Sequence, residues 1–193
     1  VEASMNDMDG VLVVESYLEF SDSTATGNLR DGVLLVESES VLNAATLIDQ
    51  VVHGLHMSGG FATVRNSDIL RNQAEGVFEQ KARLTLIDSN VSNNINNGVL
   101  LENALIDVLR TVFDANGISG LYGGNNSSAT LTDSTLTNHP ANGAFFSTSS
   151  GDFLRCTITD NAPHGIGTDV AVLVLVESAI SRNETHGIDL VNS

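Results

Sequence analysis

Two histidines near the C-terminus stand 22 residues apart, and each comes directly before a glycine. They are His164 and His186, with Asp169 and Asp189 a few residues further along. If the two segments lie side by side, the imidazole rings come within about 5 Å of each other. Two imidazoles and a carboxylate can bind a metal ion, and an imidazole can act as a general base. Because no third ligand is fixed, the simpler interpretation is that the two histidines are polar turn residues. We therefore predict no metal site.

A second candidate is a row of charged residues whose sign alternates at the same spacing. The acids Asp88, Asp133 and Glu177 alternate with Arg110 and Arg155. An arginine flanked by acids could serve as the base of a β-eliminating lyase, which makes Arg110, Arg155 and Asp133 catalytic candidates alongside the two histidines. Exposed ion pairs between neighbouring strands are the simpler interpretation.

Large apolar side chains recur at the same interval and define an outward stripe, which consists of Leu12, Leu34, Phe78, Leu100, Tyr122 and Phe145. Leaving one such side chain in water forgoes about 1.5–3 kcal/mol of burial, so a continuous stripe calls for a partner. We take Phe78, Leu100, Tyr122 and Phe145 as candidates for binding another subunit, a protein partner or a sugar ring. The alternative is that the assumed inward and outward phase is wrong, or that loops cover this wall.

These rows follow from one repeat that runs through the whole chain. Successive glycines lie 22 residues apart, with a single step of 23, at Gly10, Gly32, Gly54, Gly76, Gly98, Gly120, Gly143, Gly165 and Gly187. The step of 23 precedes Gly143, and we expect residues 121–129 to form a bulged loop there. Apolar residues alternate with polar ones on both sides of each glycine, which is the period of a β-strand. The repeat therefore predicts about nine coils of short parallel strands and no helix.

Four residues before each glycine stands a side chain that can hydrogen-bond, and seven of the nine are asparagine. The row consists of Asn6, Asn28, Gln50, Asn72, Asn94, Asn116, His139, Asn161 and Asn183. Stacked in one turn, each amide can pair with the amide of the next coil, which holds the coils in register. We expect this structural ladder, and we expect each repeat glycine to take a positive φ.

Units such as SNVSNNINNGVLL, CTITDNAPHGIGT and SAISRNETHGIDL resemble the Ser-x-Ile-Ser-x-Asn-x-x-x-Gly-Ile-x-Leu pattern of right-handed parallel β-helices. The resemblance is to the pectate-lyase-like superfamily and covers nearly the whole chain. It implies a single all-β domain over residues 1–193, a right-handed single-stranded parallel β-helix. Because the chain begins and ends inside a unit, we expect a segment of a longer chain, or partners at its ends.

The catalytic motifs of that superfamily do not match this sequence. Pectate lyases hold calcium through clustered acids beside a basic residue, and polygalacturonases carry Asn-Thr-Asp and Gly-His-Gly. Alginate epimerases carry Asp-Pro-His-Asp, whereas this chain has Ala-Pro-His-Gly at residues 162–165. No catalytic role is carried over, so the sequence favours a protein that is not an enzyme. An enzyme of this kind would be a lyase, an epimerase or a glycoside hydrolase.

Composition narrows the remaining function classes. The chain carries 24 acidic and 8 basic residues, for a net charge of −16. Such a charge argues against binding nucleic acid, which needs clustered Lys and Arg. The longest apolar runs, such as residues 170–176, are too short to span a bilayer. We predict no cofactor, but the sequence does not exclude calcium binding.

We therefore predict a non-catalytic extracellular or cell-surface rod that binds a partner or a glycan through the outward stripe. Self-association through the same stripe is a further possibility. The alternative is a polysaccharide lyase or epimerase that acts on glycans containing uronate.

Overall fold

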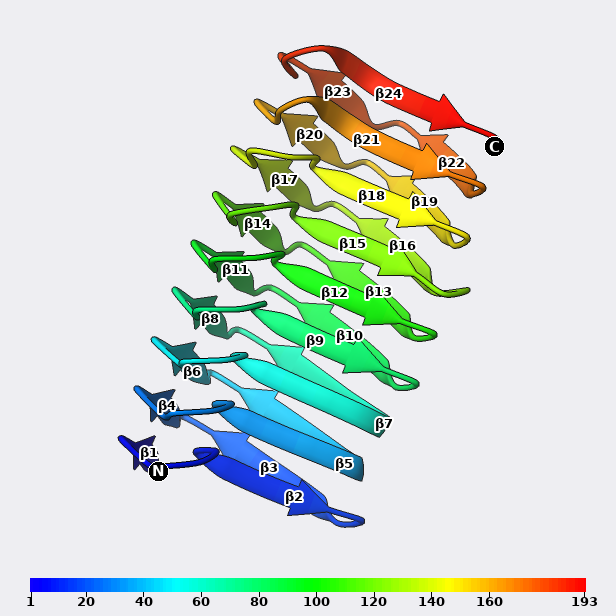
Figure 1. Ribbon diagram of the computed structural model, residues 1–193. Helices are drawn as coiled ribbons and strands as arrows, with labels where there is room; N and C mark the ends of the chain where they lie inside the picture. The colour runs from blue at the N-terminus through cyan, green and yellow to red at the C-terminus, as the bar shows by residue number, and fades with distance from the viewer.

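The computed structural model describes residues 1–193 and holds 24 β-strands and no helix (Figure 1). Every strand pair is parallel, and each coil contributes up to three strands to three stacked walls. The all-β solenoid of about nine coils is confirmed. With no helix present, none can cross a membrane.

The first wall follows the repeat glycines. It consists of β2 (Val11–Val14), the first parts of β5 (Val33–Asn43) and β7 (Leu55–Arg65), β9 (Val77–Gln80), β12 (Val99–Glu102), β15 (Leu121–Gly124), β18 (Ala144–Ser147), β21 (His164–Asp169) and β24 (His186–Val191).

The second wall comes next along each coil and consists of β3 (Tyr17–Ser21), the second parts of β5 and β7, β10 (Arg83–Ile87), β13 (Leu105–Leu109), β16 (Ser128–Thr132), β19 (Ser150–Leu154) and β22 (Val172–Val176). Because β5 and β7 run through the corner, the first two walls form one 15-stranded sheet.

The third wall is a separate 9-stranded sheet that consists of β1 (Glu2–Ser4), β4 (Thr24–Thr26), β6 (Thr46–Ile48), β8 (Asp68–Leu70), β11 (Asn90–Ser92), β14 (Val112–Asp114), β17 (Thr135–Thr137), β20 (Thr157–Thr159) and β23 (Ala179–Ser181).

Strand register follows the repeat, so that Val77 pairs with Val99 and Val99 with Leu121. The bulged loop expected at residues 121–129 is not present. Strands β15 and β16 occupy most of this segment, and the extra residue fits into the turn at Asn125 and Asn126, both of which have positive φ. A residue added at a corner lengthens the turn without disturbing the strand pairs on either side.

Side chains alternate between the core and the surface as a strand period requires. In β9, Val77 and Glu79 are buried, whereas Phe78 between them is half-buried. The interior holds one hydrophobic cluster of 35 residues that runs through the stacked coils. The inward and outward phase expected from the sequence is therefore present.

The repeat glycines have a different role from the one expected. They do not take positive φ; single residues at the corners do, such as Asp88, Asn93 and Asn103. A Cβ on Gly98 would lie 2.6 Å from the carbonyl oxygen of Gly120 and 2.8 Å from Nδ2 of Asn116. The prediction of positive φ at the repeat glycines was therefore wrong. Glycine is needed at these positions because adjacent coils approach too closely to leave room for a side chain.

The nine residues of the ladder form one row between the third and first walls, buried from Asn28 to Asn161, with Asn6 exposed and Asn183 half-buried at its ends. Oδ1 of Asn94 accepts hydrogen bonds from the backbone N–H of Asn72, at 3.0 Å, and from Nδ2 of Asn72, at 2.9 Å. Nδ2 of Asn72 also donates to the carbonyl oxygen of Leu47, at 3.3 Å. Each amide thus satisfies backbone groups as well as its neighbour, which is why these positions favour asparagine.

His139 interrupts the hydrogen bonds between amide side chains, but it keeps the hydrogen bond from the backbone N–H of the preceding coil to a ladder side chain. Its Nδ1 accepts the N–H of Asn116 at 3.1 Å, while its Nε2 is buried without a partner. Burial lowers the pKa of His139 to about 4, against the opposing effect of backbone groups of Asn116 and Phe113. The ring is therefore neutral at physiological pH and acts as an acceptor in place of the amide oxygen.

Candidate functional site

The outward stripe lies on the first wall, where its members are paired strand to strand. Phe78, Leu100, Tyr122 and Phe145 are neighbours in consecutive coils, and His56 occupies the same row one coil before Phe78; all five are half-buried. The rings of Tyr122 and Phe145 stack with their centroids 5.6 Å apart. At about 4.8 Å per coil, the five side chains form a strip about 19 Å long.

The two leucines at the N-terminal end of the row differ in environment. Leu12 is 58% exposed, whereas Leu34 is only 8% exposed. At the other end, Gly167 has no side chain, and the Phe145 ring lies over it. The accessible apolar part of the outward stripe therefore runs from Phe78 to Phe145.

The stripe is not enclosed. The shallow hollows of the surface lie elsewhere, the two most pronounced at the turns around Ser127 and Ser149 and around Ser67 and Ser89. A strip of this kind offers contact area along the rod and does not surround a small molecule.

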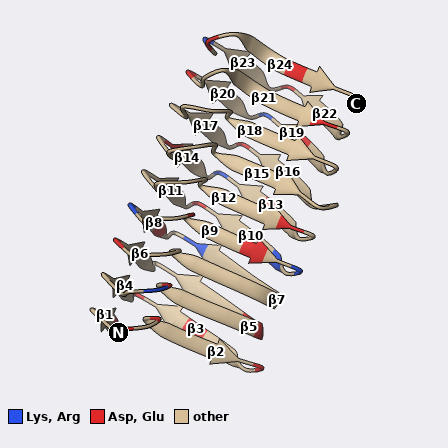
Figure 2. Cartoon of the chain, viewed as in Figure 1, with Lys and Arg blue, Asp and Glu red and all other residues tan.

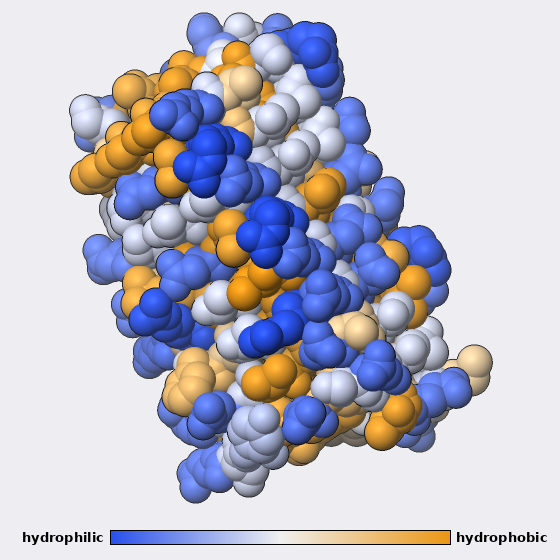
Figure 3. All heavy atoms as spheres, turned by 180° about the vertical axis from the view of Figure 1, so that it is seen from behind, coloured by the Kyte–Doolittle hydropathy of each residue, from blue (hydrophilic) through white to orange (hydrophobic).

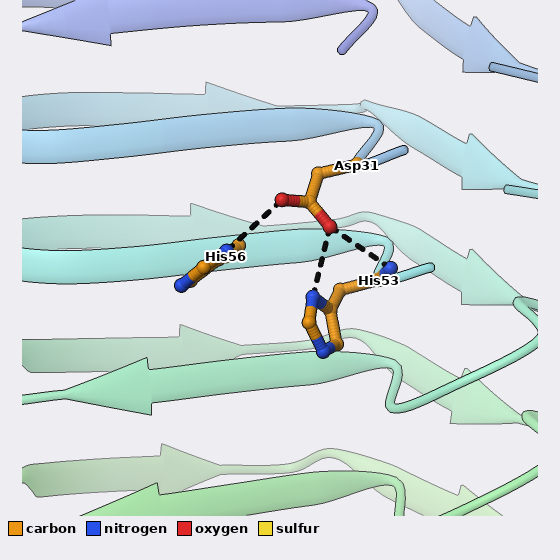
Figure 4. A group of neighbouring side chains, drawn as sticks. All are labelled: Asp31, His53 and His56. Atoms are coloured by element: carbon orange, nitrogen blue, oxygen red, sulfur yellow. Dashed lines mark hydrogen bonds and ion pairs between the residues drawn. The ribbon is translucent and has the colours of Figure 1, made fainter. Parts of the chain in front are cut away.

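A polar cluster lies at the N-terminal end of the strip, where Asp31 contacts two histidines (Figure 4). Asp31 precedes β5, His53 precedes β7, and His56 is the second residue of β7. Oδ1 of Asp31 lies 2.8 Å from Nδ1 of His53, and Oδ2 lies 2.9 Å from Nδ1 of His56. Nε2 of His53 lies 3.4 Å from Oε2 of Glu75 in the next coil. We call these four residues the Asp31 cluster.

The repeat explains why these residues meet. Asp31, His53 and Glu75 each precede a repeat glycine, so they occupy one position in three successive coils. At this position a side-chain oxygen accepts the N–H of the residue one coil on, as Asp31 Oδ1 does for His53 at 3.1 Å. Asn97 does the same for Ser119 at 3.2 Å. This contact points the Asp31 carboxylate along the rod, where His56 reaches it from the stripe.

Burial and hydrogen bonding act in opposite directions on the ionisation of this cluster. Burial alone would raise the pKa of Asp31, but hydrogen bonds from His53 and His56 outweigh it and hold that pKa well below its usual value. Burial would lower the pKa of His53, but its contacts with Asp31 and Glu75 raise the pKa to about 9. The pKa of Glu75 is lowered, because its contact with His53 outweighs burial. His53 is thus an imidazolium held between two carboxylates at neutral pH.

Phe78 forms an apolar side of the cluster. Its ring centroid lies 5.3 Å from that of His53 and 5.0 Å from that of His56. The Asp31 side chain is 3% exposed, while those of His53 and His56 are 14% and 21% exposed. The cluster is therefore partly shielded from water and continuous with the stripe.

The structure brings His164 and His186 together, with ring centroids 5.2 Å apart. Nε2 of His164 lies 3.3 Å from Oδ2 of Asp189, whereas Asp169 contacts Asn192 instead. His186 is exposed, and this pair lies in the last two coils.

Arg110, Arg155 and Asp133 lie on a different corner, between the second and third walls. Arg110 donates to both oxygens of Asp88, and Arg155 donates to both oxygens of Asp133. All four side chains are exposed. Figure 2 shows such charges distributed over the turns of the coils. The same pairing recurs between Arg71 and Asp49 and between Arg182 and Asp160, which favours a structural role for these pairs.

Seen from behind, the molecule has hydrophobic side chains near its C-terminal end (Figure 3), where Val170, Val172, Val174 and Val176 are exposed. This patch belongs mainly to β22 on the second wall and is separate from the outward stripe.

Sequence reasoning missed the Asp31 cluster. Asp31, His53 and Glu75 are in one row of the repeat and His56 is in another, so neither row alone contains the cluster. The available signal was the segment His53-Gly54-Leu55-His56, which places two imidazoles on one coil, next to an acid one coil earlier. Asp31, His53 and His56 are also the residues that could hold a metal ion, since their donor atoms all lie within 4.8 Å of one another.

Comparisons with known proteins agree with this architecture. The crystal structure of pectate lyase Pel9A superposes with a TM-score of 0.57 at 13% sequence identity, covering 86% of this chain and 55% of that chain. The crystal structure of the periplasmic alginate epimerase AlgG superposes with a TM-score of 0.59 at 15% sequence identity, covering 91% of this chain and 50% of that chain. At such identities the likeness concerns the fold alone, and this chain spans about half the length of both structures.

No curated protein sequence matches the chain. Residues 9–162 match the family described as "Right handed beta helix region". The matched segment covers most of the repeats and confirms the handedness implied by the resemblance. The chain belongs to the right-handed β-helix family.

Proposed function

We propose that this chain is a non-catalytic extracellular or cell-surface rod that binds a glycan along the outward stripe. The observation that carries the proposal is the run of Phe78, Leu100, Tyr122 and Phe145 in consecutive coils, half-buried and outward-facing. Apolar and aromatic side chains beside a few polar groups are typical of ligand-binding surfaces. The open strip suits an extended chain that lies along the rod.

Electrostatics favours a neutral glycan over a polyanion. The net charge of −16 repels a chain of uronates, because like charges lower both affinity and association rate. The location outside the cytoplasm is supported by the acidic composition and by the fold shared with a periplasmic epimerase.

A polysaccharide lyase or epimerase is the second candidate, and the Asp31 cluster is the observation that favours it. A histidine between two carboxylates, next to an apolar strip, could act on a bound sugar. The high pKa of His53 makes it a poor base at neutral pH, so any catalysis there would use it as an acid or use His56.

Tyr122→Ala and Phe145→Ala are each expected to weaken glycan binding about tenfold, because each removes an apolar contact worth about 1.4 kcal/mol. Binding would be measured by calorimetry against a panel of neutral oligosaccharides, polygalacturonate, alginate and glycosaminoglycans. Phe61→Ala is the matched control, since Phe61 is 53% exposed but lies in the second-wall part of β7. Equal weakening by the control, or no binding across the panel, would count against the stripe.

The same panel separates the two candidates. Each glycan is incubated with the protein and followed for the ultraviolet absorbance of unsaturated uronates and, by NMR, for epimerised units. The rod proposal expects neither signal. Turnover that is lost in His56→Asn would establish the enzyme instead.

A further inference from the structure

We propose that the Asp31 cluster is a binding site for a divalent d-block metal ion such as Zn²⁺, held by Asp31, His53 and His56. This inference goes beyond glycan binding, which does not require a metal. Two imidazoles with a carboxylate suit Zn²⁺, Ni²⁺ or Cu²⁺, whereas Ca²⁺ and Mg²⁺ prefer sites built from oxygen ligands. The donor set therefore selects the class of ion.

The donor atoms are already nearly in position. In a tetrahedral Zn²⁺ site with bonds of about 2.05 Å, neighbouring ligand atoms lie about 3.3 Å apart. The two contacts between Asp31 and the imidazole Nδ1 atoms are 2.8 Å and 2.9 Å, and all donors lie within 4.8 Å of one another. Small side-chain rotations would open the cluster enough for an ion to replace the hydrogen bonds.

The surroundings orient the ligands in the way that metal sites require. Glu75 lies 3.4 Å from Nε2 of His53 and can accept a hydrogen bond from the Nε2–H, so that the proton lost on metal binding is the one on Nδ1, which faces the ion. A carboxylate behind a histidine ligand fixes the imidazole tautomer and orientation. Three protein ligands leave a fourth position open toward solvent, since both histidines are partly exposed.

Local charge also favours a cation. Asp31 and Glu75 contribute two carboxylates, and Asp9 adds a third, its Oδ1 accepting the N–H of Asp31 at 3.1 Å. Arg30 lies 3.6 Å from Asp9 and offsets one of these negative charges. A divalent ion would offset the excess negative charge more completely than the single imidazolium does.

The test is a Zn²⁺ titration of chelator-treated protein by calorimetry. Because His164 and His186 form a second histidine pair with Asp189 beside it, the titration uses a His164→Asn, His186→Asn background. In that background the proposal expects a single Zn²⁺ per chain, with Ca²⁺ unable to displace it. His56→Asn and, separately, Asp31→Asn should each weaken Zn²⁺ binding at least about tenfold.

Spectroscopy and folding controls keep the result interpretable. Co²⁺ in place of Zn²⁺ should give the visible absorption of a four-coordinate site, and Cu²⁺ should give an electron paramagnetic resonance spectrum with two nitrogen ligands. Circular dichroism checks that each variant folds. His56 is half-buried on the surface of β7, so His56→Asn keeps the test valid if Asp31→Asn unfolds. Absence of binding in the background protein, or unchanged binding in both variants, would overturn the proposal.

Discussion

Replacing Glu79 by methionine is expected to raise the free energy of unfolding by roughly 2 kcal/mol at pH 4, and by more at pH 8. Glu79 is fully buried on the inward row of β9, and neither carboxyl oxygen has a hydrogen-bond partner. Its neighbours in adjacent coils, on the same row, are Met57 and Leu101. Methionine has nearly the shape of glutamate and continues this apolar row, so it removes an unpaired polar group and leaves little cavity.

The pH dependence follows from the raised pKa of Glu79. Burial raises this pKa well above the ordinary value; the backbone N–H of Leu84, which does not meet hydrogen-bond geometry, offsets the effect only in part, and the nearby charge of Asp107 raises the pKa further. The folded protein therefore keeps a proton that the unfolded chain releases. The stability contributed by this proton is complete below the ordinary pKa of a glutamate and is lost as the pH rises through the folded-state pKa. Glu79→Met does not lose stability in this way, so the difference in free energy of unfolding between the variant and the wild type grows with pH.

Urea unfolding of the wild type, Glu79→Met and Glu79→Gln at pH 4 and pH 8 measures both effects. Glutamine has the same shape but does not titrate, so Glu79→Gln should remove the pH-dependent part and retain an unpaired polar group. A difference between wild type and Glu79→Met that is the same at both pH values would contradict the raised pKa. A destabilised Glu79→Met would mean that the carboxyl has a partner in the folded protein.

The fold could be predicted because the 22-residue spacing carries both the strand period and the coil register. Once the glycines are aligned, every row of the repeat becomes a row of neighbours on the rod, as the pairs of Val77, Val99 and Leu121 show. The outward stripe followed from the same alignment. A strict repeat makes long-range contacts readable from the sequence, since each coil packs on the next in the same way.

What the alignment missed depends on contacts between different rows. Asp31 and His56 are 25 residues apart and meet only because one side chain points along the rod while the other stands on the wall. The role of the repeat glycines depends on how closely two backbones approach, which spacing alone does not give. Glu79 could have been found from the sequence, because it is the acid on an inward row otherwise occupied by residues such as Met57 and Leu101.

The ladder leads to the prediction with the largest loss of stability. Asn72→Ala is expected to lower the free energy of unfolding by about 3 kcal/mol, because it leaves buried backbone groups without partners. Oδ1 of Asn72 accepts the N–H of Gln50 at 3.1 Å, and its Nδ2 donates to the carbonyl oxygen of Leu47. Both partners are themselves buried, so water cannot replace the lost bonds. Chemical denaturation gives the difference directly.

Two further variants show whether the amide itself is required. Gln73→Ala changes an exposed side chain in the next position and should leave stability nearly unchanged. Asn72→Asp keeps an acceptor for Gln50 but faces Oδ1 of Asn94 with a second oxygen where Nδ2 now donates at 2.9 Å. It should therefore destabilise the protein as much as alanine does. His139 fits this logic, because its ring replaces the acceptor of one rung but not the donor, and the hydrogen bonds between amide side chains are interrupted there and resume between Asn161 and Asn183. If Asn72→Asp retained wild-type stability, the rows would be held together by backbone pairing and core packing alone.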